Sequence, residues 1–173
     1  MVSDLSLVRV LEGDSTAECE LLFREYVEWS SERVAADGIA QFSDSDLESV
    51  HATFRAEWPK LFGPRGRLFL ATVNGEPAGV GALKPVTTEL GEVKRMFVRS
   101  AYRGTGLGRR IMTRLVDEAR ELGYRSLRLE TMPFMAEAQS LYRSIGFAYA
   151  EPFDSEGEEF GLARCELFMT LEL

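Results

Sequence analysis

The sequence predicts an α/β (mixed α+β) fold, a single domain in which helices flank a mixed sheet. The length of 173 residues suits one domain, or at most two small ones, with enough chain to bury a core. The composition, 45% hydrophobic and 28% charged residues, is that of an ordinary globular protein and excludes a largely disordered one. Along the chain, two helical segments precede a hairpin, after which strands alternate with helices, and this order is typical of a mixed sheet.

The first third of the chain is predicted to be mainly helical. A short apolar segment over residues 5–10 indicates a strand. The helix that follows is expected to end before Asp37, because Gly38 favours a turn. A second helix is predicted over residues 46–58, and Pro59 is expected to stop it because proline has no amide hydrogen to donate.

The middle of the chain carries the signals of an antiparallel hairpin. Residues 67–73 and 78–83 are predicted strands, and the Asn74-Gly75 pair between them is typical of a tight turn. A further strand is predicted over residues 92–98. The first two strands are therefore expected to pair as a hairpin.

The last part of the chain alternates between helix and strand. Apolar residues recur at helical spacing from Leu107 onwards, and Gly123 is in the position of a C-terminal cap. The remaining predicted elements are, in order, a strand over 126–131, a short helix over 135–144, and strands over 147–150 and 165–173.

Charge and composition exclude several classes of function. A net charge of −8 argues against nucleic-acid binding, which depends largely on Lys and Arg. Two cysteines and one histidine are too few for the usual four-ligand zinc site, so we expect no metal. The cysteine count fits a reducing compartment, and no stretch approaches the roughly 20 apolar residues of a spanning helix. We therefore expect a cytoplasmic protein with no membrane partner.

A glycine-rich loop between the strand over 92–98 and the next helix carries the strongest chemical signal. Glycines at three alternate positions weaken a helix start by about 1 kcal/mol each, which is tolerable where the backbone must approach a ligand. Amide groups at a helix N-terminus, together with nearby arginines, attract anions and favour a phosphate or pyrophosphate cradle. The alternative is a glycine-rich turn before a surface helix. The loop consists of Arg103, Gly104, Thr105, Gly106, Leu107 and Gly108, followed by Arg109 and Arg110.

Two common nucleotide-binding motifs do not fit this loop. A P-loop requires Lys and then Ser or Thr after its last glycine, whereas Arg109 and Arg110 follow here. A dinucleotide-binding fingerprint that begins at Gly104 requires glycine at position 109, where this chain has Arg. The fingerprint also belongs to the first strand of a βαβ unit, whereas this loop follows two helices and a hairpin. Nucleoside triphosphates and NAD are therefore disfavoured.

The segment over residues 98–108 resembles the acetyl-CoA motif of the GNAT N-acetyltransferase superfamily. That motif reads Arg or Gln, two residues, Gly, one residue, Gly or Ala, and it is matched by Arg103, Gly106 and Gly108. Residues 141–147 are similar to the second signature of the family, with a helix and a strand between the two signatures. The resemblance implies the GNAT-type fold, with a mixed, mostly antiparallel central sheet.

The resemblance also implies an activity. It indicates an acyltransferase that uses acetyl-CoA as co-substrate and transfers acetyl to a primary amine of a small molecule, peptide or protein by direct, base-assisted attack. Residues 1–173 would form a single N-acetyltransferase domain, with 1–60 as a helical acceptor-side part and 67–173 as the acetyl-CoA-binding core. Relatives are often dimers, so a homodimer is a further expectation. The alternatives are a non-catalytic acyl-CoA-binding or sensor module and a phosphate-binding module unrelated to CoA.

By the same resemblance, backbone groups bind most of the cofactor. The amides from Arg103 to Arg109 would hold the pyrophosphate, and the strand over 92–98 would bond the pantetheine arm, with Val98 the best single candidate. The amide of Met96, at an expected bulge, would lie near the thioester oxygen and stabilise the charge that develops there. The implied cofactor-binding residues are Met96, Phe97, Val98, Arg103, Gly104, Thr105, Gly106, Leu107, Gly108, Arg109, Met135, Ala138 and Tyr142.

Two side chains carry proton chemistry in this interpretation. Glu92 would take the proton of the amine, directly or through water, and Tyr142 would donate a proton or hydrogen bond to the CoA thiolate. Glu130 is the other carboxylate considered for the base. The alternatives are that Glu92 is a solvated strand end paired with Lys94 and Arg95, and that Tyr142 is a core residue.

The acceptor side is less well defined by the sequence. Met135 occupies a position where many relatives have Asn, which puts one side-chain contact to the pantetheine arm in doubt. Residues 151–160 contain five carboxylates that either attract a cationic amine or form a solvated acidic loop. Aromatic residues of the N-terminal part either line an acceptor pocket or pack in the core: Tyr26, Trp29, Phe42, Phe54 and Trp58.

Overall fold

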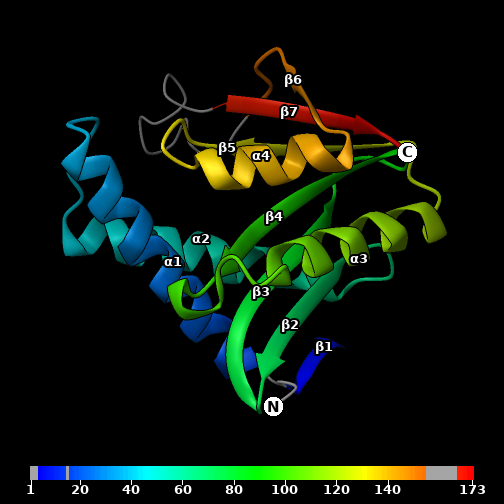
Figure 1. Cartoon of the computed structure of the whole chain (residues 1–173), viewed down its shortest axis with the longest axis horizontal. Helices are drawn as coiled ribbons and strands as arrows, with labels where there is room; N and C mark the ends of the chain where they lie inside the picture. The colour runs from blue at the N-terminus through cyan, green and yellow to red at the C-terminus, as the bar shows by residue number, and fades with distance from the viewer. Residues whose placement is uncertain (1–3, 15, 155–166) are drawn as a thin grey trace.

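The computed structural model describes residues 4–14, 16–154 and 167–173 of the chain. Its strands form one sheet in the order β1-β2-β3-β4-β5-β7-β6, and among the described strands only the β4–β5 pair is parallel (Figure 1). The predicted mixed, mostly antiparallel sheet flanked by helices is thereby confirmed. The elements are β1 (Leu5–Arg9), α1 (Thr16–Ala36), α2 (Asp44–Phe62), β2 (Arg67–Val73), β3 (Glu76–Pro85), β4 (Leu90–Val98), the short 3-10 helix η1 (Ser100–Tyr102), α3 (Leu107–Glu121), β5 (Ser126–Thr131), α4 (Ala136–Ile145), β6 (Ala148–Ala150) and β7 (Leu167–Glu172).

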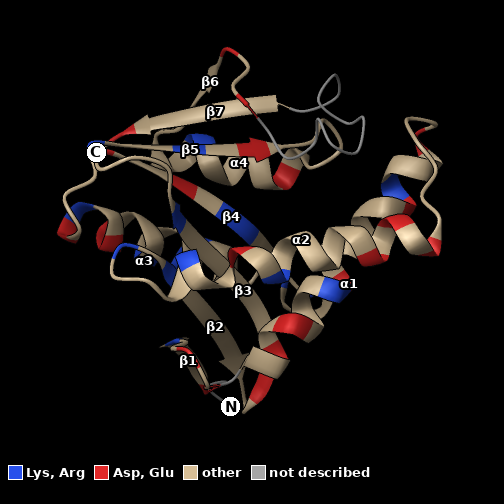
Figure 2. Cartoon of the chain, turned by 180° about the vertical axis from the view of Figure 1, so that it is seen from behind, with Lys and Arg blue, Asp and Glu red and all other residues tan. Residues whose placement is uncertain are grey.

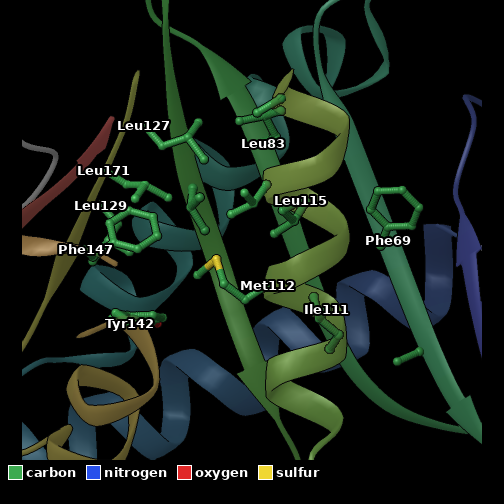
Figure 3. Packing of buried hydrophobic residues seen from close by; sticks show 14 of the residues in the cluster. Phe69, Leu83, Ile111, Met112, Leu115, Leu127, Leu129, Tyr142, Phe147 and Leu171 are labelled. Atoms are coloured by element: carbon green, nitrogen blue, oxygen red, sulfur yellow. The ribbon is translucent and has the colours of Figure 1, made fainter. Parts of the chain in front are cut away.

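The sheet separates two hydrophobic clusters, and strand alternation assigns side chains to them. Phe69 of β2 belongs to the cluster under α3, whereas its neighbours Leu68 and Leu70 belong to the cluster under α1 and α2. Figure 3 shows Ile111 and Leu115 of α3 directed at the sheet in the first cluster. Helices therefore cover both faces, with α1 and α2 on one face and α3 on the other (Figure 1).

The second helix differs from its predicted bounds at both ends. It begins at Asp44, because Ser43 forms a reciprocal capping box with Asp46. It also continues through Pro59 to Phe62, so the prediction that Pro59 stops the helix was wrong. Leu61 is buried and Phe62 packs on the same cluster, and this apolar burial offsets the hydrogen bond that proline cannot make.

The turn predictions agree with the backbone. Asn74 and Gly75 have φ values of +53° and +84°, as a tight hairpin turn between β2 and β3 requires. Gly123, the predicted cap, follows α3 with a φ of +76°. Gly146 follows α4 in the same way, with a φ of +117°. The strand predicted over 165–173 is observed as Leu167–Glu172, and residues 155–166 lie outside the described part of the chain.

The strands β4 and β5 diverge, and this divergence positions the site. Their parallel register covers three residue pairs and ends where Glu92 lies opposite Arg128. On its other edge β4 continues to pair with β3 as far as Val98. From Val93 onwards, the edge of β4 that faces β5 is therefore not covered by a strand in the described structure (Figure 1).

Candidate active site

A cavity of about 100 Å³, open to solvent, lies where β4 and β5 diverge. It is bounded by α1, β4, β5, the loop after β5 and α4, so it brings together segments from all parts of the chain. Of the predicted site residues, Met96, Met135 and Tyr142 lie in its wall, as does Glu130, the alternative base. Its lining consists of Tyr26, Val93, Lys94, Arg95, Met96, Leu129, Glu130, Thr131, Met132, Met135 and Tyr142.

A β-bulge interrupts β4 at the cavity. Val80 of β3 pairs with Phe97 and Ala82 pairs with Lys94, so that two residues of β4 lie opposite the single residue between them. Those two residues are Arg95, which has a φ of +59°, and Met96. The bulge expected near Met96 is therefore present.

The glycine-rich loop leads from β4 into the N-terminus of α3. Gly104 and Gly106 have φ values of +74° and +86°, a conformation that favours glycine, and a Cβ at either residue would point into open space. The first hydrogen bond of the helix runs from the Arg110 amide to the Gly106 carbonyl at 3.1 Å. The amides of Leu107 to Arg109 precede it and belong to the N-terminal turn, where helix amides lack intrahelical acceptors.

The arginines of the loop make contacts within the protein. Arg103 Nε donates a hydrogen bond of 3.0 Å to the Val98 carbonyl, and its guanidinium lies 4.8 Å from the ring centroid of Trp29. Arg109 donates a 2.7 Å hydrogen bond to Ser144 Oγ and so joins α3 to α4. At Gly108 the two helices approach closely, because a Cβ there would lie 3.4 Å from Leu141 Cδ2.

Tyr142 projects from α4 into the wall of the cavity. It is buried, and its ring centroid lies 6.1 Å from that of Phe147 (Figure 3). Burial, with a smaller contribution from Tyr26, raises the pKa of Tyr142 well above its ordinary value. The phenol therefore remains protonated at neutral pH and is able to donate a hydrogen bond.

The residue that precedes α4 connects the helix to β5. Met135 is the N-terminal cap residue of α4, and its sulfur accepts a 3.7 Å hydrogen bond from the Thr131 hydroxyl. Ala138, one turn later, packs against the cluster under α3. Met135 lines the cavity at the position where many relatives have the amide side chain of Asn.

Glu92 lies in a buried cluster of charges and outside the cavity lining. Its side chain is 2% exposed, with Lys94 Nζ at 2.7 Å and Arg128 Nη2 at 2.8 Å. Burial opposes its ionisation, but Lys94, Lys84 and Arg128 outweigh burial and hold the pKa of Glu92 below its ordinary value. The structure thus corrects the solvated strand end considered above, because Glu92 is buried and its cationic partners include Lys94, Arg128 and Lys84.

Glu130 is the carboxylate among the described residues that line the cavity. Its Oε2 atom lies 3.5 Å from Lys94 Nζ, so the ammonium of Lys94 lies between Glu92 and Glu130. Figure 2 shows charged residues of both signs along β4 and on α1 and α2. The geometry therefore favours Glu130 over Glu92 as a proton acceptor for a molecule in the cavity.

The aromatic residues of the N-terminal helices divide between two roles. Tyr26 lines the cavity and lies 5.9 Å from Phe97 between ring centroids. Phe54 and Trp58 pack on the cluster under α1 and α2, as the core alternative stated, whereas Phe42 is not in the cavity lining. These placements follow from long-range packing, so helical spacing alone could not separate the two roles.

The acidic segment falls partly outside the described residues. Glu151 and Asp154 are exposed, whereas Glu156, Glu158 and Glu159 lie outside the described part of the chain, as does Cys165.

Within the described residues, no group of three or more His, Cys, Asp or Glu side chains is arranged to hold a metal ion. No helix among them is both long enough and apolar enough to cross a membrane.

Sequence reasoning missed the role of α2 at the bulge. Arg95 Nη2 lies 2.8 Å from Glu57 Oε2, and its guanidinium carbon lies 3.2 Å from the ring centroid of Phe54. No local pattern pairs these residues, which are about 40 positions apart, because the contact depends on how α2 packs on the sheet. The only sequence signal was the expected bulge at Met96.

The fold and the site geometry agree with comparisons to known proteins. The family model described as "Acetyltransferase (GNAT) family" matches residues 22–147 of the chain. The chain belongs to the GNAT family. The fold class and the enzyme class expected from the resemblance, an acyltransferase, are thereby confirmed.

Individual GNAT proteins resemble the chain over most of its length. An uncharacterized N-acetyltransferase of Bacillus subtilis, YsnE, is 37% identical over 131 residues, covering 75% of this chain and 82% of the relative. The IAA acetyltransferase of Azospirillum brasilense is 39% identical over 116 residues, covering 66% of this chain and 75% of the relative. A GNAT acetyltransferase from Elizabethkingia anophelis, solved with acetyl-CoA bound, shares the fold with a TM-score of 0.64 at 19% identity, and the match covers 98% of each chain.

Proposed function

We propose that this protein is an acetyl-CoA-dependent N-acetyltransferase that transfers acetyl to a primary amine by direct attack. One observation carries the proposal: the glycine cradle at the start of α3 leads along the uncovered edge of β4 to a cavity that contains Tyr142 and Glu130. A helix start rich in free amides, an uncovered strand edge and a cavity with one proton donor and one proton acceptor thus follow one another, and this arrangement supports the proposal. The acetyl-CoA bound to the Elizabethkingia anophelis relative supports the choice of co-substrate.

The residues of the cradle fit a pyrophosphate. Gly104 and Gly106 have no Cβ where the backbone must approach a ligand, and the amides of Leu107, Gly108 and Arg109 begin a helix of 15 residues. These amides, with those of Arg103 and Thr105, would hold the pyrophosphate of acetyl-CoA. When bound, acetyl-CoA supplies an activated acetyl group as its thioester.

The uncovered edge of β4 fits the pantetheine arm. The backbone groups of Met96, Phe97 and Val98 would bind it, with Val98 as the main contact, because an extended amide chain can hydrogen-bond to a strand edge as another strand would. Met135 and Ala138 of the opposite wall would contact its other side. The Val98 carbonyl accepts a hydrogen bond from Arg103 in this structure, so an arm bound at Val98 would lie beside the guanidinium of Arg103 and would compete with it for this carbonyl.

The bulge supplies a donor for the acyl oxygen. Met96 lies in the wall of the cavity, and its amide would stabilise the negative charge that develops on the carbonyl oxygen during attack. Loss of one such donor typically costs about 3 to 4 kcal/mol of transition-state stabilisation.

Proton transfers are assigned to Glu130 and Tyr142. Once the ammonium has lost a proton, the neutral amine nitrogen forms a bond to the acetyl carbon and releases its second proton to solvent. The carbon–sulfur bond breaks, and its electron pair leaves with the sulfur. Glu130 accepts the ammonium proton directly or through a water molecule, while Tyr142 donates a hydrogen bond or its proton to the leaving sulfur and is reprotonated from solvent. Glu92, enclosed by Lys94 and Arg128, is assigned to holding the strands together.

The two parts of the chain would divide the work within one N-acetyltransferase domain. Residues 67–173 bind acetyl-CoA, and the helices of residues 1–60 shape the acceptor side, where Tyr26 reaches the cavity.

The cysteine usage supports a reducing compartment such as the cytoplasm. The acceptor amine belongs to a small molecule or a peptide, and the chain forms a homodimer by analogy with relatives.

The test is acetyl-CoA binding followed by turnover. Calorimetry with acetyl-CoA, and with ATP and NAD as controls, is expected to show selective micromolar binding of acetyl-CoA. A panel of primary amines is then assayed by release of the CoA thiol. The panel includes zwitterionic amino acids because Lys94, Arg95 and Glu130 give the cavity both signs of charge.

Each outcome of this test is informative. Binding with turnover of at least one amine supports the proposal, and the reactive amine identifies the acceptor class. Binding without turnover across small amines and amine-bearing peptides favours the non-catalytic acyl-CoA-binding module. Absence of acetyl-CoA binding contradicts the proposal as a whole.

A further inference from the structure

The strained residue of the β4 bulge is an arginine. Arg95 has a φ of +59°, a left-handed conformation that is unfavourable for any residue with a Cβ unless its surroundings hold it there. Glycine would adopt this φ without strain. The arginine side chain must therefore contribute something that offsets the backbone conformation.

The side chain of Arg95 is fixed by the helix α2. Its guanidinium lies 3.2 Å from the ring centroid of Phe54 and pairs with Glu57 at 2.8 Å, and the side chain is 9% exposed. An arginine held over a ring and bound to a carboxylate in a buried setting has little rotamer freedom. The contacts to Phe54 and Glu57 thus fix the Cα of Arg95 relative to α2.

The carboxylate of Glu57 also contacts the neighbouring strand. Its Oε1 atom accepts a hydrogen bond of 2.6 Å from Lys84 of β3, while its Oε2 atom contacts Arg95 of β4. Glu57 is buried, so screening by solvent is weak. One carboxylate therefore joins α2 to the two strands whose register changes at the bulge.

The opposite face of the bulge is fixed by close packing. A Cβ at Gly81, the β3 residue opposite the bulge, would lie 2.8 Å from Met96 Sδ and 2.6 Å from Ile111 Cγ2 of α3. Met96 is thus pressed between β3 and α3, while Arg95 is held from the α2 face. The peptide group between the two residues has restraints on both sides of the sheet.

We propose that Arg95, held by Glu57 and Phe54, is a positioning residue that fixes the bulge and so directs the Met96 amide at the acetyl carbonyl. The inference rests on the proposed function, because it assigns a target to that amide. In this proposal Arg95 does not contact the reacting atoms; it acts through the backbone of the bulge, which orients the Met96 amide. The helix α2 becomes part of the catalytic apparatus, although its side chains make no contact with acetyl-CoA in this assignment.

The competing explanation is that Arg95 binds the acceptor directly, since it also lines the cavity. Substitution by alanine and by glycine separates the two explanations. Both substitutions remove the guanidinium, but only glycine adopts the positive φ without strain. If Arg95 positions the backbone, glycine restores function that alanine loses; if it binds the acceptor, the two variants are equally impaired.

The experiment measures the Met96 donor without needing the acceptor. The carbonyl stretching frequency of acetyl-CoA labelled with ¹³C at the acetyl carbonyl is recorded by infrared difference spectroscopy when bound to wild type, Arg95→Ala, Arg95→Gly and Glu57→Gln. Calorimetry gives each dissociation constant, and thermal melting reports folding. Arg55→Ala, which removes an exposed ion pair between α2 and Glu20, is the matched control.

Wild type and Arg55→Ala are expected to lower the carbonyl frequency relative to free acetyl-CoA. Arg95→Ala and Glu57→Gln should lose most of this shift, with the dissociation constant within about threefold of wild type, and Arg95→Gly should recover it. With an amine identified by the panel, kcat should fall about tenfold or more in Arg95→Ala and recover in Arg95→Gly, with the acceptor KM unchanged. If Arg95→Ala fails to fold, Glu57→Gln and Arg95→Gly still give the comparison.

The contradicting outcomes are distinct from failure of the proposed function. A full shift in Arg95→Ala or in Glu57→Gln overturns the positioning role. Equal loss of kcat in the alanine and glycine variants, with a raised acceptor KM, assigns Arg95 to acceptor binding instead. A wild-type protein that binds acetyl-CoA with no shift removes the role of Met96 and this inference with it, whereas a wild type that does not bind acetyl-CoA refutes the proposed function itself.

Discussion

Arg103 Nε donates a hydrogen bond of 3.0 Å to the Val98 carbonyl, at the strand edge proposed for the pantetheine arm. The same guanidinium lies 4.8 Å from the ring centroid of Trp29 on α1. Arg103 thus connects the cofactor edge of the site to the helix on the acceptor side. A ligand that displaces Arg103 from the Val98 carbonyl would also change the contact between Arg103 and Trp29.

The contact between Arg103 and Trp29 gives an optical signal for cofactor binding. Acetyl-CoA is expected to change the intrinsic tryptophan fluorescence, because the charge near the Trp29 ring moves. The chain has two tryptophans, so substitution of one is the control for substitution of the other. Trp29→Phe should abolish the change and Trp58→Phe should retain it; retention of the full change in Trp29→Phe would assign the signal to Trp58 and contradict the prediction.

The cradle glycines predict a specific loss of affinity. Gly106→Ala forces a Cβ onto a residue with a φ of +86° at the start of α3, and it is expected to raise the acetyl-CoA dissociation constant about tenfold or more. Gly75→Ala, at a φ of +84° in the hairpin turn, imposes similar strain far from the cradle. Calorimetry on the two variants should show normal affinity for Gly75→Ala, and equal affinities would argue that the loop is only a turn.

Tyr142 predicts a defect in turnover and not in binding. Tyr142→Phe removes the hydroxyl that would interact with the leaving sulfur, and kcat is expected to fall about 100-fold with little change in the dissociation constant of acetyl-CoA. Tyr149→Phe is the control, because the exposed hydroxyl of Tyr149 bonds to Gln139 away from the cavity lining. A kcat within about twofold of wild type for Tyr142→Phe would return Tyr142 to the role of a core residue.

The two carboxylates predict different phenotypes. Glu130→Gln is expected to lower kcat about 100-fold or more, with the largest relative loss at low pH, where the amine acceptor is most fully protonated and the base is most needed. The rate is measured from pH 6 to 9 with the amine found in the panel, and folding is checked by thermal melting. A normal kcat in Glu130→Gln together with a large loss in Glu92→Gln at unchanged stability would restore Glu92 as the base.

Glu92 predicts a pH-dependent contribution to stability. Its pKa is lowered in the folded protein, so its stabilisation is present above the unfolded pKa of about 4.3 and is lost as the pH falls through the folded value. Glu92→Gln removes the buried carboxylate that Lys94 and Arg128 share and should cost about 3 kcal/mol at pH 7, or roughly 6 to 12 °C in Tm. The difference in stability between wild type and Glu92→Gln should narrow below about pH 4. Glu121→Gln, an exposed control on α3, should be as stable as wild type.

Local sequence patterns predicted most of the fold and the glycine-rich loop before α3. The Asn74-Gly75 turn, the glycines after α3 and α4 and the loop from Gly104 to Gly108 depend on neighbours in the chain, and they agree with the structure. Glycine and asparagine at a positive φ are visible in a sequence because few other residues adopt that conformation.

The features that the sequence did not predict depend on distant partners. The continuation of α2 through Pro59 follows from burial of Leu61 on the sheet, which no local signal reports. Burial of Glu92 depends on Arg128 of the neighbouring strand, and the positive φ of Arg95 depends on Glu57. Charged residues in a strand look alike in a sequence whether they face solvent or one another.

The last residue pair of the β4–β5 register, Glu92 opposite Arg128, is also an ion pair. Because the parallel contact has only three residue pairs, these set the alignment of β5, β7 and β6 against the rest of the sheet. A slip of one residue would exchange the faces of Leu129 and Glu130 and separate Arg128 from Glu92. The Glu92–Arg128 ion pair thus helps to fix the register of β5 against β4, because the observed alignment places the two charges opposite each other.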